Sequence, residues 1–107
     1  MDGTAGFSVE VEGGDPQVLR LVGELDLSGV PELRARFAEL GGGVDVDCSG
    51  LDFIDASGLG VLVAAHRACD ARGAKLVIVD PSPCVRRLLE LTSLDAGLHV
   101  RRNGSAS

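Results

Sequence analysis

The chain has 107 residues, a length that suits one domain with a single hydrophobic core. Its net charge of -6 and its pI of about 4.7 disfavour a nucleic-acid partner, because most of the surface would repel a polyanion. Aromatic residues make up only 3% of the chain, which also argues against modules that stack on bases.

The cysteines and the first residues indicate the compartment. The chain has an odd number of cysteines, and all three lie in apolar segments: Cys48, Cys69 and Cys84. This is typical of reduced thiols in a cytosolic protein. The first ten residues hold neither a basic region nor an apolar run, so no signal peptide is expected. The longest apolar run, residues 61–65, is too short to cross a bilayer. We therefore expect a cytoplasmic protein that does not insert into a membrane.

The first part of the chain predicts a hairpin followed by a helix. Apolar and polar residues alternate over 7–11, which predicts a strand with one wet face. Turn-forming residues 13–16 separate it from a second apolar run, 18–22, so the two strands are expected to form a hairpin. Ser28 is then the expected N-cap of a helix that has Pro31 in its first turn.

The rest of the chain alternates between strand and helix. Apolar periodicity predicts a strand at 44–49, a helix at 57–72, a helix from about 85 to 92 and a short strand at 98–100. The continuous apolar run at 75–79 predicts a buried strand between the two helices. Gly73 is a natural stop for the second helix.

The order β-β-α-β-α-β-α-β predicts a single α/β domain. Helices between strands imply parallel pairing through right-handed crossovers, and the first hairpin adds an antiparallel portion, so the sheet is expected to be mixed. No linker divides residues 1–107. We expect the folded core to span about 7–101 and the tail, 102–107, to be disordered.

The stretch SGLDFIDASGLG, residues 49–60, holds the triplet Ser-Gly-Leu twice. The first triplet is expected to end a strand, with Ser49 in a turn, and the second to start a helix. The apolar residues from Leu51 to Ile54 are expected to anchor this turn to the core. The shared letters therefore have different roles, and a true repeat is rejected.

Catalysis and metal binding fit this stretch poorly. Ser57 lacks the flanking glycines of a nucleophile elbow, and His66 lies about 13 Å further along the same helix, too far to act as its base. No Walker lysine is present, and a calcium loop starting at Asp45 would need a glutamate where Ala56 stands. No Cys/His spacing suggests zinc. We expect no catalytic residues, no cofactor and no metal.

The helix start near residue 57 is instead suited to contact with another protein. Ser57 is expected to act as the N-cap, accepting from the free backbone N–H groups. Gly58 and Gly60 would cost helix stability, so close approach of a partner or tight packing on the sheet explains them equally well.

Three blocks of the sequence resemble the STAS domain family, specifically the free-standing bacterial anti-sigma factor antagonists. They are Gly23-Glu24-Leu25-Asp26, then DCSGLDFIDASGLGVLV, and then CVRRLLELTSL after a Pro-rich turn. Their order and spacing are similar to the family's, and the resemblance covers about residues 7–101.

The resemblance implies a binding protein and not an enzyme. It implies that the chain sequesters an anti-sigma factor, often a serine kinase of the histidine-kinase-like ATPase fold, and so frees a sigma factor. In the family this kinase inactivates the antagonist by phosphorylation at the start of the second helix, and a phosphatase reverses the modification. The alternative is a STAS module that acts as a signalling scaffold or as a subunit of a lipid or anion transport system.

The implied partner-binding residues are Asp26, Asp55, Ala56, Ser57, Gly58 and Gly60. Asp26 is open to a second interpretation, as a cap of the helix that follows it.

The sequence departs from the family pattern at residue 56. The usual motif reads D-S-S-G-L or D-S-T-G-L, and its phosphoacceptor directly follows the aspartate; here Ala56 follows Asp55. Three explanations stay open: Ser57 takes the phosphate one position later, the antagonist is constitutive or regulated differently, or Ala56 is an engineered replacement.

Overall fold

The fold is taken from a computed structural model, which describes residues 6–92 and 97–102. Its strands are β1 (Phe7–Glu12), β2 (Gln17–Leu25), β3 (Val44–Ile54), β4 (Leu76–Val79) and β5 (His99–Arg101). Its helices are the short 3-10 turn η1 (Leu27–Gly29) and the α-helices α1 (Val30–Ala38), α2 (Ala56–Ala71) and α3 (Pro83–Thr92). The end of the predicted disordered tail, 103–107, lies outside the described residues.

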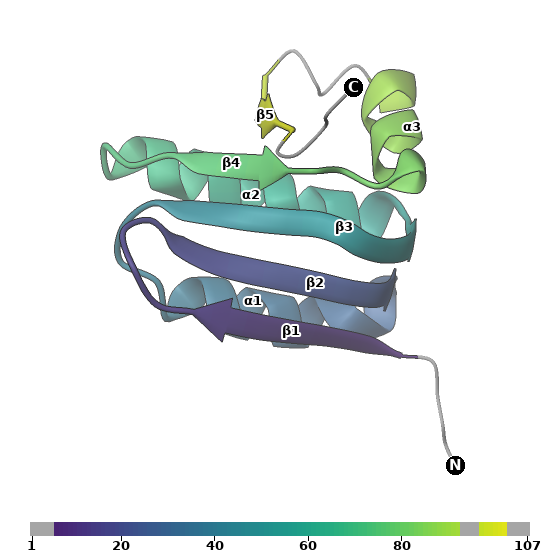
Figure 1. Ribbon diagram of the computed structural model, residues 1–107, viewed down its shortest axis with the longest axis horizontal. Helices are drawn as coiled ribbons and strands as arrows, with labels where there is room; N and C mark the ends of the chain where they lie inside the picture. The colour runs from purple at the N-terminus through teal and green to yellow at the C-terminus, as the bar shows by residue number, and fades with distance from the viewer. Residues whose placement is uncertain (1–5, 93–96, 103–107) are drawn as a thin grey trace.

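The five strands form one mixed sheet in the order β1-β2-β3-β4-β5, which Figure 1 shows from β1 at the bottom to β5 at the top. β1 pairs antiparallel with β2, and the other neighbouring strands pair parallel. The predicted element order and the predicted mixed sheet are confirmed, with η1 as an addition. Parallel strands need a crossover connection, and α1, α2 and α3 provide the three crossovers.

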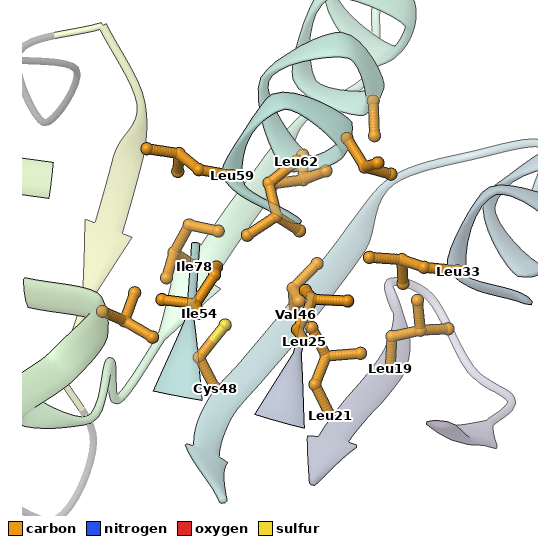
Figure 2. Packing of buried hydrophobic residues seen from close by; sticks show 14 of the residues in the cluster. Leu19, Leu21, Leu25, Leu33, Val46, Cys48, Ile54, Leu59, Leu62 and Ile78 are labelled. Atoms are coloured by element: carbon orange, nitrogen blue, oxygen red, sulfur yellow. The ribbon is translucent and has the colours of Figure 1, made fainter. Parts of the chain in front are cut away.

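The core lies between the sheet and the helices α1 and α2, which Figure 1 shows behind the strands. Leu33 of α1 and Leu59 and Leu62 of α2 point toward the strands, where they meet side chains such as Val46 and Ile78 (Figure 2). Leu33, Leu62, Val46 and Ile78 are fully buried. Burial of this aliphatic surface is the main favourable term that holds the helices on the sheet.

The opposite face of the sheet carries charged side chains that alternate with the core residues. On β2, Arg20 lies 2.9 Å from the carboxylate of Glu12 and 3.6 Å from that of Asp47. Arg101 of β5 lies 2.8 Å from Asp45 of β3. Asp45 and Asp47 of β3 therefore lie on the polar face of the sheet.

β3 is longer than the sequence predicted. Its pairing with β2 continues to the pair Leu25 and Ile54, so the first Ser-Gly-Leu triplet lies inside the strand. The prediction that Ser49 sits in a turn is wrong, because the backbone groups beyond it find partners in β2. The Ser49 hydroxyl donates to Asp47 Oδ1 at 2.7 Å.

α2 ends as the sequence predicted. Gly73 follows the helix with a φ of +77°, a left-handed conformation that favours glycine.

No helix in the described part of the chain is long and apolar enough to cross a membrane.

Candidate partner-binding surface

The carboxyl ends of β2 and β3 place the predicted site residues at one edge of the sheet. Leu25 and Ile54 are paired in the register, and the Asp55 N–H donates to the Leu25 carbonyl at 3.2 Å. Asp26 directly follows Leu25 in the chain, as Asp55 follows Ile54. The structure therefore brings the two predicted segments, 26 and 55–60, together at the carboxyl ends of the strands, where ligands of parallel sheets commonly bind.

Asp55 is the N-cap of α2. Its backbone is extended, with φ −114° and ψ −174°, and its side chain accepts from the Gly58 N–H at 3.1 Å. The Asp55 carbonyl accepts from the Leu59 N–H at 3.0 Å. The prediction that Ser57 is the cap is wrong, because Ser57 already lies within the first helical turn and a cap must precede it.

Ala56 and Ser57 differ in exposure. Ala56, the first helical residue, is exposed, whereas Ser57 is partly buried. The Ser57 hydroxyl makes no side-chain hydrogen bond to any other described residue. The exposed first residue of α2 thus carries only a methyl group, and the hydroxyl-bearing Ser57 beside it is less exposed to solvent.

The two glycines of the helix start have different roles. A Cβ on Gly58 would lie 2.6 Å from Leu25 Cγ and 3.0 Å from the Leu25 carbonyl oxygen, so this glycine lets α2 pack on β2. Gly58 is buried, and the expectation that it offers surface to a partner needs correction. Gly60 is exposed, and a Cβ there would meet nothing within 4 Å, so tight packing does not explain it.

Asp26 organises the turn η1. Its Oδ1 accepts from the Ser28 hydroxyl at 2.6 Å and from the Ser28 N–H at 3.0 Å. These two hydrogen bonds hold the pKa of the Asp26 carboxyl below its ordinary value, and the bond from the Ser28 hydroxyl has the larger effect. The prediction that Ser28 caps α1 is wrong: Asp26 caps η1, and α1 begins after Gly29 without a side-chain cap.

Two exposed apolar side chains adjoin the carboxylates and were not predicted as site residues. Leu27 is 71% exposed beside Asp26, and Phe53 is 46% exposed two residues before Asp55. Phe53 was expected to anchor a turn to the core. Leu27 gave one signal in the sequence, because it precedes Ser28, the expected start of the helix, and so lies outside the apolar stripe of that helix.

The exposed apolar surface continues from Phe53 toward α3. A groove of about 200 Å³ separates the end of β3 from this helix and is lined by Phe53, Ile54, Cys84, Arg87, Leu88 and Leu91. Leu91 at its rim is 74% exposed. Exposed apolar side chains of β3 and α3 thus lie close to the start of α2.

The histidines and the possible metal ligands of the described residues were also located. The rings of His66 and His99 contact each other edge to face, with centroids 5.6 Å apart. Within residues 6–92 and 97–102, no three or more His, Cys, Asp or Glu side chains are grouped so that they could hold a metal ion.

Comparison with known proteins places this arrangement in a family. Residues 9–101 match the family model described as "Mlab, STAS domain". An anti-sigma F factor antagonist of Lysinibacillus sphaericus is 31% identical over 93 residues, covering 82% of this chain and 80% of the relative.

Solved structures agree with the sequence match. The anti-sigma factor antagonist SpoIIAA in its unphosphorylated form is 26% identical, with a TM-score of 0.73, and the match covers 89% of this chain and 87% of that one. The Bacillus cell fate determinant SpoIIAA in its phosphorylated form is 25% identical, with a TM-score of 0.69 and coverages of 89% and 90%. The chain belongs to the STAS domain family.

Proposed function

We propose that the chain is an anti-sigma factor antagonist, which binds an anti-sigma factor and so frees a sigma factor for transcription. The observation that carries the proposal is the exposed start of α2, at Ala56 and Gly60, beside the capped turn at Asp26. The names of the relatives, antagonists of anti-sigma factors, support the same function. The chain then acts by binding, in the cytoplasm, and not as an enzyme.

The geometry suggests how such a partner is held. Ala56 and Gly60 present a methyl group and a bare backbone, so another protein can approach the helix start closely. Leu27 and Phe53 supply apolar area that becomes buried on contact. The carboxylates of Asp26 and Asp55 at this edge favour a partner with a basic surface. Among anti-sigma factors, we propose a serine kinase of the histidine-kinase-like ATPase fold.

Regulation at this site differs from a simple phosphoserine switch. Ala56 cannot be phosphorylated, and Ser57, the nearby hydroxyl, is partly buried. We propose that Ser57 is a poor acceptor and that binding is constitutive, so a phosphatase is needed only if Ser57 is modified. A phosphate on Ser57 would be compatible with the helix N-terminus but would add charge beside Asp55.

Two experiments test the proposal. Pull-down with the full chain from its source cell is expected to recover an anti-sigma factor, and the captured complex is expected to lack the sigma factor. Recovery of transporter subunits instead would support the alternative of a transport or scaffold module. Incubation with the captured kinase and ATP is expected to leave the chain unmodified; phosphate incorporation that is lost in Ser57→Ala would overturn the constitutive model and leave the binding function intact.

A further inference from the structure

A hollow separate from the partner-binding surface lies between α3 and β5, which Figure 1 shows beyond β4 at the top of the sheet. Its volume is about 250 Å³, and it is lined by Pro81, Arg86, Leu89, Glu90, Val100 and Arg102. None of these residues belongs to the helix start or to η1.

The hollow has an apolar side. Pro81 and Leu89 are buried, and Val100 is 41% exposed. An exposed valine on a short edge strand, facing the same space as a buried leucine, offers apolar surface that a ligand can cover.

The hollow also has two guanidinium groups that have no carboxylate partner within residues 6–92 and 97–102. Arg86 Nε is buried and has no hydrogen-bond partner among the described residues. Neither Arg86 nor Arg102 forms an ion pair with a described residue, whereas Arg20 and Arg101 lie within 3 Å of carboxylates. A buried donor without an acceptor is unfavourable, and an anion in the hollow would satisfy it.

Glu90 is the one carboxylate among the six lining residues. It is exposed and forms no ion pair with Arg86. Its charge would weaken anion binding without blocking the buried Nε.

We propose that this hollow binds a small organic anion, a carboxylate or phosphate head on a short apolar body. The head group accepts from Arg86 Nε and from the guanidinium of Arg102, since guanidinium groups pair well with both kinds of oxyanion. The apolar body lies on Leu89 and Val100. This site does not depend on the proposed anti-sigma function.

The test is a titration of the full 15N-labelled chain, followed by amide NMR shifts, with octanoate as the probe. Octanoate is expected to bind with a dissociation constant of about 1 mM, as suits a ligand of this size. The largest shifts are expected at Leu89, Val100 and Arg102. Inorganic phosphate is expected to shift the Arg102 amide at higher concentration, and 1-octanol to leave it unchanged. Shifts centred on the Phe53 groove, or equal shifts with 1-octanol, would overturn the proposal.

Variants separate the charge from the buried N–H. Arg86→Lys keeps the charge but removes Nε, and it is expected to weaken octanoate binding about tenfold. Arg102→Gln, at an exposed position, is expected to weaken it similarly without affecting folding. Glu90→Gln is expected to strengthen binding.

Arg87→Gln is the matched control, because Arg87 is exposed on the same helix and does not line the hollow. It removes the same charge from the chain and is expected to leave octanoate affinity unchanged. Equal affinity in Arg87→Gln and Arg102→Gln, whether both are weakened or both unaffected, would contradict the assigned site.

Discussion

The Asp26 carboxylate accepts hydrogen bonds from both the hydroxyl and the N–H of Ser28. Because these hydrogen bonds favour the charged form, they lower the pKa of Asp26 below its ordinary value of 3.8. The stability that this carboxylate contributes is present above 3.8 and is lost as the pH falls through the lowered pKa.

We predict that Ser28→Ala raises the pKa of Asp26 toward 3.8, because the shorter of the two hydrogen bonds is removed. The pKa is measured by NMR titration of the side-chain carboxyl carbon. Ser49→Ala, which removes a similar contact to Asp47, is the control and should leave the Asp26 pKa unchanged. An unchanged pKa in Ser28→Ala would show that the hydroxyl does not set it.

Cys48 lies in the core, and burial raises the pKa of its thiol to about 12. The thiolate is the reactive form, so we predict that Cys48 resists alkylation at pH 8 in the folded chain. Cys84 is partly exposed and should react first. Iodoacetamide labelling followed by peptide mass spectrometry measures both rates, and equal labelling of Cys48 and Cys84 would contradict this assignment.

At the scale of elements, the start of α2 depends on one cap. We predict that Asp55→Ala lowers the free energy of unfolding by about 1 kcal/mol, because the bond to the Gly58 N–H is lost. Ser57→Ala, two residues later and inside the helix, should change stability by less than about 0.5 kcal/mol. Urea unfolding measures both. A larger loss in Ser57→Ala than in Asp55→Ala would restore Ser57 as the cap.

The two glycines of α2 form a second matched pair. We predict that Gly58→Ala destabilises the chain by about 1–3 kcal/mol, since the new methyl would collide with Leu25. Gly60→Ala has open space around it and should stabilise the helix by up to about 1 kcal/mol. Thermal unfolding compares them, and equal effects would mean that α2 does not pack on β2 as described.

Apolar patterns were sufficient to give the order of the elements, because the alternation in β1 differs from the helical spacing in α2 and the short apolar run of β4 suits a buried strand. It could not choose between Asp55 and Ser57 as the cap. Both residue types cap helices well, and only the extended backbone of Asp55 decides between them. The prediction that Phe53 packs in the core was wrong. Phe53 stands in an apolar run with Leu51 and Ile54, which are buried, and the sequence of this run does not reveal which member is exposed.

At the scale of the molecule, the fold gathers the site from segments far apart in the sequence. Pairing of β2 with β3 brings the turn after Leu25 to the start of α2, about thirty residues later. The family resemblance identified the residues of this edge, but their neighbours Leu27 and Phe53 became visible only with tertiary structure. The groove beside α3 likewise depends on packing between distant elements.

The most direct test of the account is the affinity of the full chain for the anti-sigma factor of its source cell, measured for wild type, Ala56→Glu and Ala64→Glu. Both alanines are exposed on α2, about 12 Å apart along the helix. An acidic residue at position 56 suits the helix N-terminus, so the fold should tolerate it. We predict that Ala56→Glu weakens binding about 100-fold, because it places a charge in the contact, and that Ala64→Glu changes it less than about twofold. Equal affinity of all three proteins would contradict a partner-binding surface at the start of α2.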